Sequence, residues 1–98
     1  MPLLQNNAAD YFPDQQEINQ VDKITWITGV ENGAAYQKVD NNSNELCKVR
    51  VRYADDSVDH YRLDPGETTG SLYMSIDNQA QNIDTLCNVN QCVFEDSF

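Results

Sequence analysis

Residues 45–63 decide the fold, and they read ELCKVRVRYADDSVDHYRL. Apolar and charged side chains alternate over residues 45–53 and again over residues 58–63, on either side of the polar segment 54–57. Alternation with a period of two on both sides of a short polar turn is typical of a β-hairpin that has one buried and one exposed face. The stretch therefore predicts two antiparallel strands.

The register of this hairpin follows from the need to keep charge out of the core. When odd-numbered residues face each other, the apolar face consists of Cys47, Val49, Val51, Tyr53, Tyr61 and Leu63. A register shifted by one residue would instead place His60 and Arg62 beside the valines. We therefore expect a turn of about three or five residues, in which Asp56 adopts a left-handed conformation.

The opposite face of the same hairpin carries most of the basic side chains of the chain. The candidate binding residues are Lys48, Arg50, Arg52, His60 and Arg62. Clustered guanidinium and ammonium groups can bind a carboxylate, a phosphate or an acidic partner. The alternative is a solvated sheet face whose charges pair with acids on neighbouring strands.

A second hairpin is expected around Asn32-Gly33, because a type I′ turn needs positive φ at both central residues. The preceding segment 23–30 is dense in β-branched and aromatic residues. A two-residue loop pairs Trp26 with Val39 on the core face. It also sets Gly29 opposite Tyr36 on the other face, where the aromatic ring can cover the bare glycine backbone.

Further strands are expected at residues 71–77 and 83–89, with a short continuation at 92–94, and the polar run 40–44 is expected to be a surface loop. Without a credible helix, this pattern predicts an all-β fold, a small antiparallel β-sandwich or barrel of about six strands. The succession of polar loop, hairpin and Pro-Gly-Glu turn over residues 40–76 resembles immunoglobulin-like sandwiches in its architecture.

With 98 residues, the chain is expected to hold one domain. We assign residues 22–98 to a single β-sandwich domain and residues 1–21 to an N-terminal arm without regular structure. Asp14 and Glu17 form a weak capping pattern, which allows one helical turn over residues 15–19. Tyr11 and Phe12 are expected to dock on the sheet or on a partner.

The chain is strongly acidic, with 16 acidic and 6 basic residues and a formal net charge of −10. This charge argues against direct binding to nucleic acid or to an anionic membrane, because such binding depends on Lys and Arg. It suggests a basic partner, or solubility alone. No apolar run approaches the roughly 20 residues that span a bilayer. A soluble, cytoplasmic protein is expected, and secretion after removal of an unseen leader remains the alternative.

Cys47, Cys87 and Cys92 are an odd number of cysteines, which does not fit a fully paired secreted framework. Three reduced thiols are the favoured interpretation. A bridge between Cys87 and Cys92 is the alternative in an oxidising compartment. Cys47 is expected to be a small core residue.

No catalytic or metal-binding pattern stands out. Asp59 and His60 are adjacent in a strand and point to opposite faces, so they cannot act as a catalytic pair. The segment that begins at Asp40 resembles the opening of a calcium loop, but Glu45 and Val51 occupy the positions that an EF-hand gives to Gly and Glu. We expect no enzyme activity, no cofactor and no metal. Asn41-Asn42-Ser43 fits a glycosylation sequon.

The sequence therefore predicts a non-enzymatic, acidic binding protein that engages another protein, with a basic target suggested by charge and a homodimer left open. An inhibitor or immunity-type protein from a bacterium or phage is the type expected. The alternative is a lectin-like or calcium-assisted ligand-binding module that uses the Asn-rich and Asp-rich loops at 40–45 and 77–84. A hydrolase is the least favoured.

Overall fold

The computed structural model describes residues 13–87, which form seven strands and no helix. The strands are β1 (Gln15–Val21), β2 (Ile24–Glu31), β3 (Ala34–Asn41), β4 (Cys47–Tyr53), β5 (Val58–Leu63), β6 (Leu72–Met74) and β7 (Ala80–Cys87). Within the described part of the chain, no helix is long and apolar enough to cross a membrane.

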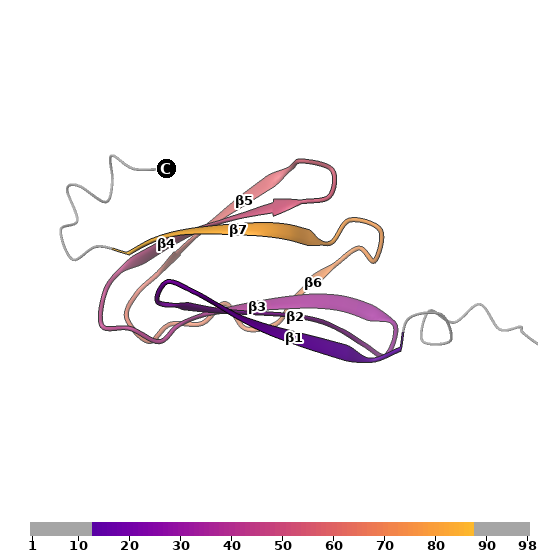
Figure 1. The fold of residues 1–98 in the computed structure, drawn as a ribbon, viewed down its shortest axis with the longest axis horizontal. Coiled ribbons are helices and arrows are strands. Elements are labelled where there is room, and N and C mark those ends of the chain that lie inside the picture. The colour runs from indigo at the N-terminus through magenta and orange to yellow at the C-terminus, as the bar shows by residue number, and fades with distance from the viewer. Residues whose placement is uncertain (1–12, 88–98) are drawn as a thin grey trace, which may run out of the picture.

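The strands form two antiparallel sheets that pack face to face, with strand orders β1-β2-β3-β6 and β5-β4-β7 (Figure 1). The predicted all-β sandwich is therefore confirmed, and the strands form two separate sheets rather than a closed barrel. The likeness to immunoglobulin domains is one of architecture, since those domains divide their strands as ABED and CFG. Here β1, β2 and β3 follow one another within one sheet.

The β2–β3 hairpin has the predicted turn and register. Asn32 and Gly33 have φ values of 53° and 81°, and Trp26 lies opposite Val39. Gly29 lies opposite Tyr36, where a Cβ atom on Gly29 would stand 2.7 Å from the Tyr36 ring. Only glycine fits at this position, because the same Cβ atom would also stand 2.6 Å from the backbone oxygen of Gln15, which cannot move aside as a side chain can.

The β4–β5 hairpin also has the predicted register, with Cys47 opposite Leu63 and Val49 opposite Tyr61. The Tyr53 amide donates to the carbonyl of Ser57 at 2.9 Å, which leaves three residues in the loop. Asp56 has a φ of 69°, the left-handed conformation expected from the sequence. The core-based argument for the register is thus confirmed.

The core lies between the two sheets and draws on both hairpins. Its buried residues are Ile24, Trp26, Val39, Cys47, Val49, Val51 and Leu63, with Tyr53, Tyr61, Ala80, Ile83 and Cys87 packed against them. Burying a large aliphatic side chain stabilises a fold by roughly 1.5–3 kcal/mol. The burial of these side chains is therefore the main interaction that holds the two sheets together.

The polar run 40–44 is not wholly a surface loop, as the sequence suggested, because β3 continues to Asn41. The Asn41 side chain is completely buried. Its Nδ2 donates to the carbonyls of Glu45, Leu63 and Asp64 at 2.7, 3.0 and 3.1 Å. A residue that looks like a turn former is thus the buried link between the β3–β4 loop and the end of β5.

The segment 15–21 is a strand rather than an irregular arm, and the helical turn predicted for residues 15–19 is wrong. β1 pairs with β2 along its whole length. The Asp14 carboxylate accepts a hydrogen bond from the backbone amide of Asn32 at 2.9 Å and does not cap a helix. β1 is an edge strand, and sheet β5-β4-β7 leaves it largely exposed. It therefore has polar residues on both faces and lacks the alternation of apolar and polar residues that marks a half-buried strand.

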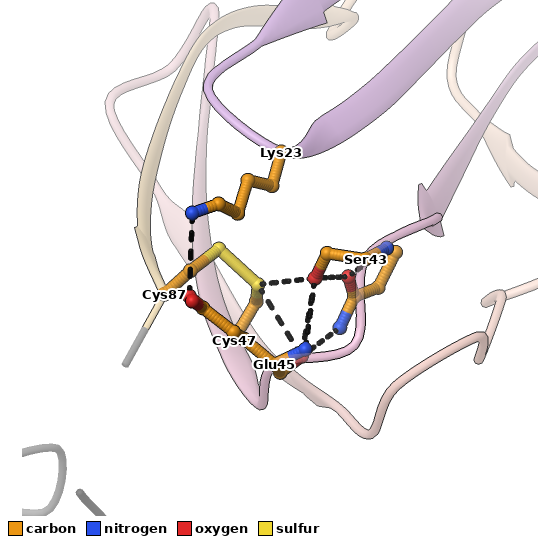
Figure 2. A network of polar contacts seen from close by, with 6 residues as sticks. Lys23, Ser43, Glu45, Cys47 and Cys87 are labelled. Atoms are coloured by element: carbon orange, nitrogen blue, oxygen red, sulfur yellow. Dashed lines mark hydrogen bonds and ion pairs between the residues drawn. A yellow bond between two sulfur atoms is a disulfide. The ribbon is translucent and has the colours of Figure 1, made fainter. Parts of the chain in front are cut away.

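The cysteine prediction is also wrong, because Cys47 and Cys87 form a disulfide (Figure 2). The two residues lie directly opposite each other on β4 and β7, with Cα atoms 4.1 Å apart. Neither three reduced thiols nor a bridge from Cys87 to Cys92 agrees with this arrangement. Cys47 is a buried core residue, as expected. Cys92 lies outside the described residues.

The last two strands differ from their predicted bounds. β6 is shorter than the expected segment 71–77, and β7 begins earlier than residue 83. The remaining predictions, on Tyr11 and Phe12 and on the continuation at 92–94, concern residues outside the described part of the chain.

Candidate functional site

The five predicted binding residues lie together on the outer face of sheet β5-β4-β7. β4 and β5 place Lys48 directly opposite Arg62, and Arg50 directly opposite His60, with Arg52 opposite the apolar Val58. Directly opposed residues of an antiparallel pair point to the same side of the sheet. We call this surface the basic face. The structure confirms the placement of the five residues, and their binding role stays a prediction.

β7 completes the basic face, which the sequence could not show. Its register brings Asn82, Asp84 and Leu86 to the same side. The Arg50 guanidinium donates to Asp84 Oδ2, from Nη2 at 3.0 Å and from Nε at 3.3 Å. Both side chains are substantially exposed, so this ion pair is worth about 0.2–1 kcal/mol at most. Its main effect is to hold Arg50 in one orientation.

The basic face has the opposite charge to the rest of the molecule. The three strands bring four Lys and Arg residues and one acid, Asp84, to this side, a formal charge of +3 with His60 neutral. Since the whole chain carries −10, the balance of −13 belongs to the rest of the chain. The charge of this small protein is therefore divided between one cationic sheet face and an acidic remainder.

The pairing of like charges within the basic face has an energetic consequence. Like charges directly opposite each other on neighbouring strands destabilise a sheet. The register imposes this arrangement on Lys48 and Arg62. Beside them lies a depression of about 180 Å³ that is lined by Lys48, His60, Tyr61 and Arg62.

A second polar constellation lies on the inner side of the same hairpin. Trp26 Nε1 donates to Gln37 Oε1 at 3.0 Å, and Gln37 Nε2 donates to the Tyr53 hydroxyl at 2.8 Å. That hydroxyl donates to Asp59 Oδ2 at 2.8 Å, and the Tyr61 hydroxyl reaches the same oxygen at 3.4 Å. The result is a chain of hydrogen bonds that begins in the core and ends on an exposed carboxylate.

Two tyrosine pKa values respond to this constellation. Burial, together with the hydrogen bond to Asp59, raises the pKa of Tyr53 well above its ordinary value. Burial also raises the pKa of Tyr61, and the neighbouring charge of Asp59 adds to the effect. Both hydroxyls therefore stay protonated at neutral pH and act as hydrogen-bond donors to the carboxylate.

Sequence reasoning missed this constellation because it took the odd-numbered side of the hairpin to be a core face. Two signals were available. Asp59 is an acid at a core-face position of the alternating pattern, and Gln37 is a polar residue in the equivalent place on β3. Gln37 is completely buried, and a buried amide needs partners. Trp26 and Tyr53 are those partners.

The remaining sequence candidates find less support. Asp59 lies opposite Val51 whereas His60 lies opposite Arg50, so the two side chains point to opposite faces as expected. Among residues 13–87, no group of three or more His, Cys, Asp or Glu could hold a metal ion. Because the Asn41 amide nitrogen is buried and donates to three carbonyls, the sequon there is closed to modification in the folded protein.

Comparison with known proteins gives no family assignment. No protein-family model matches the chain, no curated protein matches it, and no solved structure matches it. The fold and the two polar constellations therefore define the protein only as a small, disulfide-containing antiparallel β-sandwich with a cationic sheet face.

Proposed function

We propose that this protein is a non-enzymatic binding module that engages an acidic surface of another protein through the basic face. One observation carries the proposal, namely the concentration of a +3 patch on one sheet face of a chain whose remainder carries −13. Charge segregation of this kind orients a partner during approach and raises the rate of productive encounter.

The acidic remainder narrows the class of partner. A nucleic acid or an anionic membrane presents negative charge over an area wider than one sheet face, so the surrounding acids would repel it. A protein can instead match a cationic patch with a local cluster of carboxylates. Planar guanidinium groups such as those of Arg52 and Arg62 suit carboxylates because they donate two parallel hydrogen bonds.

The inhibitor or immunity-type role rests on size and charge alone and stays a prediction. The location of the protein is a separate part of the proposal. The sequence suggested the cytoplasm, with secretion as the alternative. The disulfide between Cys47 and Cys87 supports an oxidising compartment, because cytosolic thiols are kept reduced. Trapping of free thiols in intact cells, followed by mass spectrometry, tests this part.

The binding proposal is tested with a synthetic polyglutamate peptide and two double variants. Lys48→Gln with Arg62→Gln removes two charges from the basic face. Lys23→Gln with Lys38→Gln removes two charges outside it, where each lysine pairs locally with an acid. We expect the wild-type protein and the second variant to bind the peptide with a strong salt dependence. We expect the first variant to bind at least about tenfold more weakly, a loss of roughly 1.4 kcal/mol.

Equal weakening in both variants would mean that the peptide responds to overall charge and would contradict a role for the basic face. Absence of binding at low ionic strength would contradict the proposal as a whole. A duplex DNA of matched charge serves as the comparison ligand. Tighter binding to DNA than to the peptide would overturn the partner class.

A further inference from the structure

A hollow of about 260 Å³ lies where the end of the β4–β5 hairpin approaches β6. Tyr53 and Asp59 line it from the hairpin, and Tyr73 and Met74 line it from β6. This hollow is separate from the basic face, since Asp59 occupies the odd-numbered side of its strand and His60 the even-numbered side. Its walls combine the rings of Tyr53 and Tyr73 and the side chain of Met74 with a polar part formed by Ser57, Asp59, Ser75 and Asn78.

The Asp59 carboxylate is held in a fixed orientation. Its Oδ2 accepts from the hydroxyls of Tyr53 and Tyr61, and Tyr53 is itself fixed by Gln37. Within residues 13–87, no hydrogen bond reaches the second oxygen, Oδ1. A carboxylate oriented in this way has one oxygen committed to the protein and one available to a ligand.

The buried Gln37 helps to hold the Asp59 carboxylate in its fixed orientation. A completely buried amide in a β-sandwich core is costly unless each of its polar groups is paired. Gln37 is paired on both sides, with Trp26 behind it and Tyr53 in front of it. The core thus contains a polar residue whose effect is to fix the position of a surface constellation.

We propose that this hollow is a binding site for the primary ammonium group of a lysine side chain presented by a partner protein. Oδ1 of Asp59 accepts the ammonium, while the aliphatic stem of the lysine packs along Tyr73 and Met74. Tyr53 and Tyr73 add aromatic surface, which favours a cation. The net charge of −10 attracts basic partners to the molecule as a whole.

The geometry favours an ammonium over a guanidinium. Arginine binds a carboxylate best through two parallel hydrogen bonds, one to each oxygen. At Asp59 that arrangement is obstructed, because Oδ2 already accepts from two hydroxyls. An ammonium is a compact point charge that needs only one oxygen. A divalent metal ion fits less well, because it demands about six oxygen ligands.

The site does not depend on the function proposed for the basic face, and it is tested separately. The probe is N-acetyl-lysine methylamide, titrated into ¹⁵N-labelled protein and followed by amide chemical shifts. We expect saturable shifts in the segments around Asp59 and Tyr73. Asp59→Asn should weaken binding about two- to fivefold, because the pair that it removes is exposed to solvent. Asp22→Asn removes the same charge from the β1–β2 turn and should leave the affinity unchanged; its φ of 56° is tolerated by asparagine.

Two further probes keep the test independent of how the variant folds. The norleucine analogue has the same stem without the charge, and it should produce no saturable shift in the wild-type protein. The arginine analogue should bind more weakly than the lysine probe. The proposal is overturned by an absence of saturable shifts with lysine, by equal binding of norleucine, by tighter binding of arginine, or by full affinity in Asp59→Asn.

Discussion

Reduction of the disulfide between Cys47 and Cys87 should destabilise the fold strongly. The two cysteines are 40 residues apart in sequence, so the bond closes a long loop in the unfolded chain. The prediction is best tested in a Cys92→Ser background, which leaves these two cysteines as the only thiols that can pair.

The magnitude follows from the length of the loop. Closing a loop of this length lowers the entropy of the unfolded chain by an amount worth about 4 kcal/mol at 25 °C. For a domain of this size, each kcal/mol corresponds to roughly 4–8 °C in Tm. We therefore expect reduction to lower Tm by about 15–30 °C. Since small domains are stable by about 5–15 kcal/mol, the loss is a large fraction of the total.

Two measurements check this prediction. Tryptic digestion without reductant should join residues 39–48 to residues 63–98, because cleavage after Lys38, Lys48 and Arg62 puts Cys47 and Cys87 in those two peptides. Thermal unfolding with and without reductant then gives the change in Tm. Reductant added to a Cys47→Ala, Cys87→Ala, Cys92→Ser variant serves as the control and should have no effect.

The reasoning is refuted by either of two results. A digest in which the two peptides stay separate would mean that β4 and β7 are not covalently joined. A joined digest with a Tm change of only a few degrees would mean that the unfolded chain gains little freedom on reduction, and the loop-closure argument would fail.

Two further predictions concern the buried polar groups. Asn41→Ala removes the donor to three carbonyls and should reduce the free energy of unfolding, measured by urea denaturation, by about 2–4 kcal/mol. The control Asn42→Ala loses only an exposed hydrogen bond to Thr25 and should change that free energy by less than about 1 kcal/mol. Equal losses in the two variants would count against the anchoring role of Asn41. Because the pKa values of Tyr53 and Tyr61 are raised in the folded protein, the unfolded chain loses these protons first. The contribution of the two tyrosines to stability should therefore be constant below about pH 10 and be lost as pH rises above it. Absorbance at 295 nm should show late ionisation of Tyr53, and a Tyr53→Phe variant with an unchanged alkaline profile would refute the assignment.

Both hairpins could be predicted because their determinants are local. The turn at Asn32-Gly33 and the alternation on either side of Asp56 each fix a pairing between segments that adjoin in sequence. The gathering of Lys48, Arg50, Arg52, His60 and Arg62 on one face followed from that register alone. For this reason the candidate site was predicted in part, before any information on long-range contacts.

The contacts between distant segments could not be predicted in the same way. β7 pairs with β4 across the whole β5–β6 region, and only this pairing places Asp84 beside Arg50 and Cys87 against Cys47. The polar strand β1 escaped detection because an exposed edge strand needs no alternation of apolar residues.

The sequence by itself determined the two hairpins, their buried faces and the five residues of the basic face, because each depends on the period of side-chain alternation within one stretch of chain. The tertiary structure alone decided the disulfide, the ion pair on the basic face and the hydrogen-bond chain from Trp26 to Asp59. The disulfide and the ion pair join β4 to β7, which are distant in sequence, and the hydrogen-bond chain depends on the contact between Gln37 of one sheet and Tyr53 of the other. No local pattern specifies which distant strands become neighbours.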